Sequence, residues 1–272
     1  MTRTHKFGIT VLGQTFFLIT YAVPFIWIVL TSLKKSTDVF DSSKSVVFTP
    51  TLEAYQRVAD IHLLQALGQS ALIASLSTAL VLLVAVPAAY ALARSSAWWS
   101  VAMLAVLIVF QMIPQTSTVI PLFKVLGNLN LLDSLAGVVI ADASLMTPFA
   151  IILLRPFFRS VPEAVEEASS LDGAGSFRSF WSVVLPIARN GIATTGTVVF
   201  IIVWGEFLYS VNFFMTPGKY PLSAMLAQQV SSYGVNWSGL MALAVVTAIP
   251  IAILYAVSYR LLKEGLTVGA VK

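Results

Sequence analysis

Residues 98–123 read WWSVAMLAVLIVFQMIPQTSTVIPLF, a stretch without a single charged side chain. A transmembrane helix needs about 20 mainly apolar residues, because each residue advances about 1.5 Å through a hydrocarbon core about 30 Å thick. This stretch therefore predicts a membrane-spanning helix. The whole chain agrees, since 58% of its 272 residues are hydrophobic, 10% are charged and the mean hydropathy is +0.88. A soluble domain carries roughly a quarter of charged residues, so we expect most of the surface to face lipid.

Five further stretches have the length and composition of membrane-spanning helices. They lie at about 9–31, 70–93, 134–154, 190–214 and 238–259. Prolines inside several of these stretches indicate kinked helices in a packed bundle, which membrane proteins tolerate when neighbours satisfy the freed backbone groups. We therefore predict an all-α membrane protein with six transmembrane helices, forming a single membrane domain over residues 1–272.

The distribution of Lys and Arg favours a cytoplasmic N-terminus and a cytoplasmic C-terminus. With this orientation ten basic residues lie on the cytoplasmic side and six on the external side, in agreement with the usual excess of positive charge inside. Lys34 and Lys35, directly after the first predicted helix, oppose it. The orientation gives an external loop at about 33–69 and a cytoplasmic loop at about 156–189, between the fourth and fifth helices.

A short acidic helix is predicted in the cytoplasmic loop, over residues 162–171. Pro162 is favoured at a helix start, and three glutamates lie near the positive end of the helix dipole. Gly173 follows, and glycine adopts the positive φ of a helix end at little cost. The glutamates are Glu163, Glu166 and Glu167.

A second, aromatic helix is predicted after the glycine turn. It carries Phe177, Phe180 and Trp181, and Pro186 closes it before the fifth membrane helix. Two interpretations of the loop stay open. It is either a docking element for a soluble partner or an interfacial helix with its aromatic side chains among lipid headgroups. Interfacial helices normally carry Lys and Arg on their polar face, so the three glutamates favour docking.

The same loop carries a motif with a known spacing. Glu167-Ala168-Ser169, three residues, Gly173, nine residues and Val183-x-Leu185-Pro186 follow one another. This pattern resembles the EAA signature of permeases in binding-protein-dependent ABC importers, which reads EAA, three residues, G, nine residues and I-x-L-P. Ser169 replaces a small residue and Val183 an isoleucine, while the spacing is fully kept. Leu171-Asp172-Gly173-Ala174 is typical of the carbohydrate-type branch.

The likeness extends over nearly the whole chain. Residues 87–94, reading PAAYALAR, and residues 111–114, reading QMIP, fit the second and third helices of the family. Trp204-Gly205-Glu206-Phe207 resembles the family's W-N-E-F, with Gly205 in place of asparagine. The C-terminal residues 265–272 are similar to the tail of the maltose-permease small-subunit type.

The resemblance implies a multi-pass permease subunit of a sugar importer in the prokaryotic inner membrane. Its implied partners are a second homologous permease, two cytoplasmic ATPase subunits and an extracytoplasmic solute-binding protein, and the ATPase subunits would bind ATP and Mg. By matching position, the acidic helix would dock on the ATPase and the C-terminal tail would contact it. The docking set is Glu163, Glu166, Glu167, Ala168, Ser169, Leu171, Asp172 and Gly173, and the tail set is Gly265, Gly269 and Lys272.

No catalytic, metal-binding or nucleic-acid-binding role is expected of this chain. It has no cysteine, and His5 and His62 lie far apart in sequence, so neither thiolate nor histidine metal sites are indicated. The sequence holds no Ser/His/Asp set and neither an HExxH nor a GxxxxGK motif. We therefore expect no enzyme activity and no cofactor in this chain.

Two carboxylates fall inside predicted membrane helices, Asp142 in the fourth and Glu206 in the fifth. Ionisable groups at membrane depth are costly and are candidates for a translocation pathway, although each could also lie near an interface or bond to a neighbouring helix. Sugars bind through hydrogen bonds and aromatic faces, so four further residues are candidates: Gln111, Trp204, Tyr209 and Asn212. An alternative function, an autonomous secondary transporter or channel using the two carboxylates, leaves the acidic loop unexplained.

Overall fold

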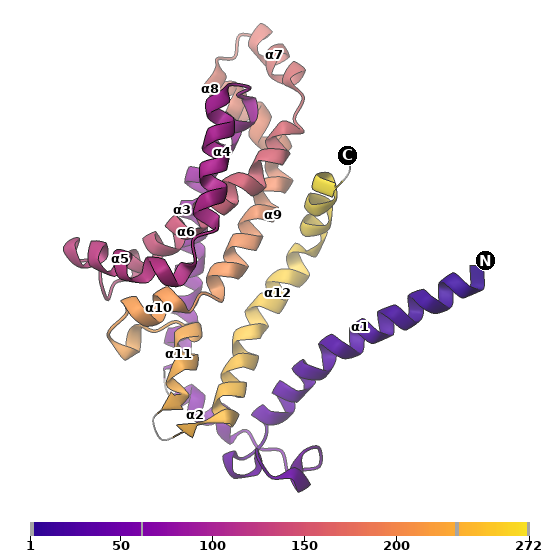
Figure 1. Cartoon of the computed structure of the whole chain (residues 1–272), viewed down its shortest axis with the longest axis vertical. Helices are drawn as coiled ribbons and strands as arrows, with labels where there is room; N and C mark the ends of the chain where they lie inside the picture. Colours follow the sequence, from indigo (N-terminus) through magenta and orange to yellow (C-terminus); the bar gives the residue numbers. More distant parts are fainter. Residues whose placement is uncertain (1–2, 61, 232–233, 271–272) are drawn as a thin grey trace. The chain divides into compact units, whose positions relative to one another are not determined.

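The computed structural model describes residues 3–60, 62–231 and 234–270, and almost every element in it is a helix (Figure 1). Among the described residues, five helical stretches are long and apolar enough to cross a membrane. A sixth candidate is a bent pair of shorter helices. The prediction of a mainly helical membrane protein is therefore confirmed. The five stretches are Gly13–Ser32, Leu63–Arg94, Leu135–Arg159, Ser176–Trp204 and Trp237–Tyr259.

The charge-free stretch over residues 98–123 is divided between two helices, so the prediction of one continuous helix is wrong. Helix α4 (Trp98–Gln111) ends first, and α5 (Gln115–Asn128) leaves at an angle of 95°. Pro114 lies at the corner with a φ of −59° and a ψ of 133°. Proline has no backbone N–H and disfavours a helical conformation in the residue before it. The stretch is consequently a broken span or a re-entrant loop.

The fifth predicted helix is shifted toward the N-terminus. Helix α9 (Leu185–Trp204) follows α8 (Ser176–Ser179) and the π-helical segment η3 (Phe180–Val184) as one helical stretch. Pro186 is the second residue of α9 and directly follows the π-helical turn, so the helix continues through it. The prediction that Pro186 closes the aromatic segment is therefore wrong. The predicted end of the fifth helix, at residue 214, lies ten residues beyond the observed end at Trp204.

The chain forms two compact units. The first consists of Met1–Leu64 and Met225–Pro250. It contains α1 (Arg3–Ser32), the 3₁₀ helices η1 (Ser36–Asp38) and η2 (Ser42–Lys44), α2 (Glu53–Asp60), the hairpin of β1 (Val230–Ser231) and β2 (Gly234–Val235), and the first part of α12 (Trp237–Ala270). The predicted loop after the first helix thus has local structure of its own.

Lys34 is buried inside the first unit. Its side chain is 2% exposed, and its Nζ atom donates a hydrogen bond to the carbonyl of Ser45 at 2.7 Å. The same atom lies 5.2 Å from the ring centre of Trp27 and 5.1 Å from that of Phe48. Buried ammonium groups require such partners. Lys34 therefore has a structural role, which accounts for its presence in a connection that the charge distribution assigns to the external side.

The second unit consists of Gln65–Ala224 and Ile251–Lys272. Helix α6 (Leu135–Arg159) packs against both α4 and α9. Small side chains allow α3 (Leu63–Arg94) to approach closely, since Ala74 and Ser77 are fully buried and the Ser77 hydroxyl lies 3.4 Å from the carbonyl of Val139. The remaining elements are α7 (Glu163–Leu171), α10 (Leu208–Phe213), η4 (Pro217–Lys219), the first three residues of α11 (Leu222–Gln228), whose other four belong to the first unit, and α12 from Ile251 onward.

A carboxylate fixes the segment before α6 to the loop after α10. Asp133 accepts hydrogen bonds from the backbone N–H groups of Met215 at 2.9 Å and Thr216 at 3.0 Å. It also accepts the Thr216 hydroxyl at 2.8 Å and the Lys219 ammonium at 2.7 Å. These donors, Lys219 first among them, hold the pKa of the Asp133 carboxyl well below its ordinary value of 3.8. The charged form of Asp133 therefore stabilises this corner.

The substitution Asp133→Asn is expected to loosen the corner near neutral pH. A lowered native pKa means that the carboxylate stabilises the fold above its unfolded pKa, and this contribution is lost as the pH falls through the native pKa. Backbone hydrogen exchange of residues 213–219 should be faster in Asp133→Asn than in the wild type at about pH 7, and the two should converge in acid. Asp60→Asn, which removes an exposed carboxylate elsewhere, is the control. Equal exchange in Asp133→Asn and the wild type near neutral pH would show that the carboxylate does not hold this corner.

Candidate functional site

Helix α7 lies at one end of the second unit, away from α10 (Figure 1). It begins at Glu163 after the extended Pro162 and ends at Leu171, as the sequence predicts. Gly173 has a φ of +84°, in the left-handed region that favours glycine. None of the nine residues of α7 is buried, and Leu171 is 89% exposed. The helix therefore presents a free surface, which includes Glu163, Glu167, Ala168, Leu171 and Asp172.

Glu166 differs from its neighbours because its side chain is bonded to the end of α3. Its carboxylate accepts hydrogen bonds from Arg94 Nε at 2.6 Å and from the Tyr90 hydroxyl at 2.6 Å, and Arg94 Nη2 also bonds to it. The Arg94 guanidinium further donates to the carbonyls of Phe158 at 2.9 Å and Val161 at 3.0 Å. The guanidinium thus joins the end of α3, the end of α6 and α7.

Solvent screens this ion pair only weakly. The Arg94 side chain is 16% exposed and that of Glu166 is 18% exposed. All three guanidinium nitrogens have acceptors, so the charge is both paired and hydrogen-bonded. Losing one partner of such a pair leaves a poorly solvated charge, which costs more than the loss of a surface salt bridge. The resemblance includes all three glutamates in the docking set, and the structure adds that the Glu166 carboxylate is bonded to Tyr90 and Arg94 of α3.

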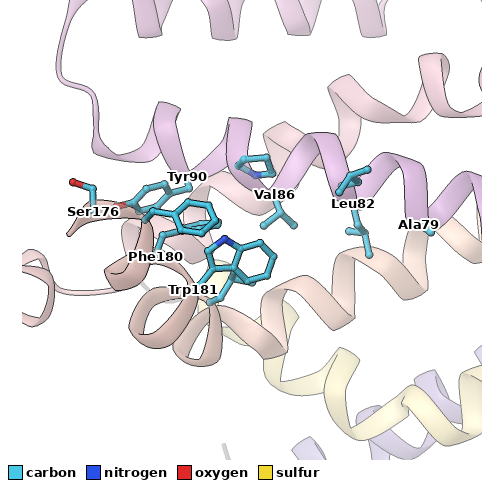
Figure 2. A pocket seen from close by; sticks show the side chains of 11 residues that line it. Ala79, Leu82, Val86, Tyr90, Ser176, Phe180 and Trp181 are labelled. Carbon is cyan, nitrogen blue, oxygen red and sulfur yellow. The ribbon is translucent and has the colours of Figure 1, made fainter. Parts of the chain in front are cut away.

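Aromatic packing joins the segment after α7 to helix α3, which also carries Arg94. The ring centre of Phe180 lies 4.8 Å from that of Tyr90, which is 5.9 Å from that of Phe158. Trp181 packs edge-on against Phe180 at 5.8 Å. Phe180 and Trp181 lie opposite Val86 and Leu82 of α3 (Figure 2), and these residues line an apolar groove of about 740 Å³. Motion of this segment is therefore coupled to α3 by packing as well as by the ion pair.

A second polar site is a cavity of about 380 Å³ beside the break between α9 and α10. Asp142 of α6, Gln115 of α5, Gly205 and Glu206 line it, together with apolar side chains of α6, α9 and α10. Asp142 and Glu206, predicted as pathway candidates, therefore meet in one place. Asp142 is 1% exposed, and neither of its carboxylate oxygens has a hydrogen-bond partner among the described residues.

Glu206 was expected inside the fifth membrane helix, but it lies two residues beyond the end of α9. Its Oε1 accepts hydrogen bonds from the backbone N–H of Tyr209 at 2.7 Å and from Gln115 Nε2 at 2.8 Å, and its Oε2 accepts from the N–H of Ser210 at 3.2 Å. These N–H groups have no partner within α10, because the first turn of a helix leaves its donors free. The Glu206 side chain therefore caps α10 and ties it to α5.

The other predicted pathway residues are distributed around these helices. Gln111 and Tyr209 line a separate cavity of about 470 Å³, where the Tyr209 hydroxyl bonds to Thr118 at 2.6 Å. Trp204 is 4% exposed on α9, and the exposed Asn212 bonds to the carbonyl of Leu208 at 2.6 Å. Trp204 and Asn212 line neither cavity. Gln115 and Thr118 were not predicted, although the polar run QTST after Pro114 is a signal for them.

The C-terminal tail continues helix α12 as far as Ala270. Gly265 and Gly269 lie in the last turns of α12, and Lys272 lies outside the described residues. The role that the resemblance implies for this tail stays a prediction.

Comparison with known proteins identifies the family. The model of the family "Binding-protein-dependent transport system inner membrane component" matches residues 82–268, which is more than half of the chain. The chain belongs to this family. It is accordingly a multi-pass membrane permease subunit of an ABC importer, and the inference from the EAA-like motif is confirmed. The alternative of an autonomous secondary transporter or channel is not supported.

Relatives match nearly the full length of the chain. The sulfoquinovosyl glycerol transport system permease protein SmoH of Agrobacterium fabrum is 31% identical over 265 residues, covering 96% of this chain and 92% of that protein. The trehalose transport system permease protein SugB of Mycobacterium tuberculosis is 30% identical over 259 residues, covering 94% of each. A crystal structure of a bacterial ABC transporter involved in alginate import has a chain with a TM-score of 0.79, at 22% identity, covering 96% of this chain and 98% of that one. This last likeness supports the fold.

Replacing Arg94 is expected to free α7 from the bundle. Arg94→Gln keeps a polar side chain but removes the charge from Glu166 and the donors from two carbonyls, at a local cost of about 2 kcal/mol. Hydrogen exchange of residues 161–171 should accelerate about thirtyfold, while that of α6 near Asp142 stays unchanged. Arg159→Gln removes the same charge from an exposed position at the end of α6 and should leave α7 unaffected. Identical exchange in both variants would rule out the tether.

Proposed function

We propose that this chain translocates a sugar or sugar-like solute, delivered by an extracytoplasmic binding protein, and that separate subunits supply the energy by hydrolysing ATP. The observation that carries the proposal is the combination of an exposed surface on α7 with the partly shielded Arg94–Glu166 ion pair that bonds this helix to the bundle. An exposed helix bonded to the ends of two membrane helices suits the transfer of a movement from a soluble partner. The names of the relatives SmoH and SugB, which concern sulfoquinovosyl glycerol and trehalose, support a carbohydrate as the solute.

The proposed topology has six membrane spans, with both termini in the cytoplasm. In this topology the bent pair α4–α5 is the third span, and α7 is a cytoplasmic coupling helix between the fourth and fifth spans. The excess of Lys and Arg on the cytoplasmic side supports this orientation. An even number of spans places both termini on the same side of the membrane, in agreement with this orientation.

The proposed complex contains this chain, a second homologous permease, two ATPase subunits and the binding protein. The ATPase subunits hold ATP and Mg, and a permease subunit of this kind is not itself catalytic. The exposed side chains Glu163, Glu167, Ala168, Leu171 and Asp172 form the surface for the ATPase, and the end of α12 is a second contact. The acidic residues of α7 favour a partner surface that carries basic side chains.

The mechanism follows from the two connections of α7. When the ATPase subunits close, they move α7, and Glu166 transmits the movement through Arg94 to the ends of α3 and α6. The helical stretch from Ser176 to Trp204 carries the movement toward Gly205. Asp142 on α6 and Glu206 after α9 line one cavity, so a displacement of α6 relative to α9 changes its shape. The permease thereby converts a cytoplasmic movement into altered access at membrane depth.

The turn at Gly173 provides a test of docking. Gly173→Val forces a β-branched residue to a φ of +84°, at a cost of about 1–2 kcal/mol or a displaced turn. Gly175→Val is a matched control, because Gly175 has a φ of −68° and a ψ of 163°, which valine adopts freely, and open space for a side chain. Both variants should reach the membrane in normal amounts.

The measurement is the amount of ATPase that copurifies with the chain, together with the ATP hydrolysis of the isolated complex. Gly173→Val should lose most of both, and Gly175→Val should retain them. Normal copurification and hydrolysis with Gly173→Val would contradict the assignment of α7 as the docking helix.

A further inference from the structure

The cavity beside the α9–α10 break contains a carboxylate that the fold leaves unsatisfied. Asp142 is 1% exposed, and both its oxygens lack a hydrogen-bond partner among the described residues. Buried polar groups are nearly always hydrogen-bonded, and an unpaired one is costly. Asp142 lines the cavity together with Leu145 and Met146 of the same helix, and these two apolar side chains offer it no hydrogen bond. The side chain is therefore available to a molecule in the cavity.

The cavity offers hydrogen-bond acceptors and no cationic side chain. A carboxylate has about four lone-pair sites. Glu206 uses three of these for Gln115, Tyr209 and Ser210, whereas no described residue donates a hydrogen bond to Asp142. No Lys, Arg or His is among the lining residues. A molecule bound here must bring hydrogen-bond donors, and an anion would be repelled by the two carboxylates.

Gly205 keeps the cavity open at its wall. Its φ of −87° is accessible to every residue, so the backbone does not require glycine here. A Cβ atom built on Gly205 has its nearest neighbours, the carbonyl oxygens of Ile201 and Ile202, at 3.8 Å. Packing therefore does not require glycine either. A larger side chain at this position would project into free space and take volume from the cavity.

We infer that this cavity is a binding subsite for an uncharged polyhydroxyl solute, with Asp142 as the principal acceptor of its hydroxyl groups. The inference rests on the proposed function and narrows the solute to neutral sugars and polyols. A volume of about 380 Å³ lies in the lower range of small-molecule sites. The apolar side chains Leu145, Met146, Ile202 and Phe207 exclude water from the acceptors, which strengthens each hydrogen bond to the solute.

The experiment uses the full chain, copurified with its partner subunits in lipid nanodiscs. Dicyclohexylcarbodiimide, which modifies carboxyl groups in apolar surroundings, is the reporter, and peptide mass spectrometry locates the label. The competing solutes are trehalose, glucose, sorbitol and glucuronate. We expect Asp142 to be labelled and at least one of the three neutral solutes to slow its labelling about tenfold at ten times its Kd. Glucuronate should give no protection.

Two glycine variants sharpen the result. Gly205→Asn, which places the family's usual residue in the wall of the cavity, should raise the half-protecting concentration about tenfold, because the larger side chain takes up volume that the solute needs. Gly68→Asn makes the same change at an exposed position of α3 with open space around it and should leave protection unchanged. A Gly205→Asn chain that does not fold leaves the wild-type comparison of neutral and anionic solutes as the test.

Absence of protection by all three neutral solutes, or equal protection by glucuronate, would overturn the inference. The labelling does not depend on ATP hydrolysis, so this failure is distinct from a failure of the proposed function. A complex with normal ATPase docking and no protection would contradict the subsite alone. Protection without any copurified ATPase would contradict the importer mechanism and leave the subsite standing.

Discussion

The ion pair between Arg94 and Glu166 is the interaction on which the functional account depends. It bonds a solvent-exposed helix to the ends of two membrane helices, and the Tyr90 hydroxyl and the Phe158 and Val161 carbonyls complete it. A helix of nine residues has little stability of its own. Its position must therefore come from tertiary contacts, and no residue of α7 is buried. The Arg94 guanidinium supplies the fixed point that hydrophobic packing does not.

The two helix breaks place the polar residues of the second unit. The bend at Pro114 turns the polar N-terminal end of α5 toward the cavity, so that Gln115 reaches Glu206. The break after Gly205 frees the Glu206 carboxylate to cap α10. Broken helices at membrane depth are tolerated where the exposed backbone groups find partners inside the protein. The same breaks leave room for a solute, which suits a transporter.

The sequence predicts features that depend on neighbouring residues. Apolar length locates Leu135–Arg159 correctly, and Pro162 and Gly173 mark the ends of α7 because capping signals are local. The break within residues 98–123 is not predicted, although Pro114 is visible. A proline either kinks or ends a membrane helix, and here the packing of α5 against α10 accompanies the second outcome.

The site is less predictable because its contacts are distant in sequence. Arg94 and Glu166 are 72 residues apart, and no local sequence pattern pairs them. Glu206 is assigned to a helix by its apolar surroundings, whereas the end of α9 at Trp204 shows only in three dimensions. Asp142 is the reverse case. A carboxylate is costly at membrane depth, so the sequence alone singles out Asp142, and the structure adds that no residue it describes is hydrogen-bonded to the side chain.

The central claim is that Arg94 holds α7 rigidly on the bundle, and a distance measurement between two spin labels tests it most directly. The chain has no cysteine, so Leu171→Cys on α7 and Val109→Cys on α4, both exposed, introduce unique labelling sites. Double electron–electron resonance should give a single narrow distance distribution with Arg94 present and a broad one after Arg94→Gln. Distributions of equal width with and without Arg94 would contradict the account.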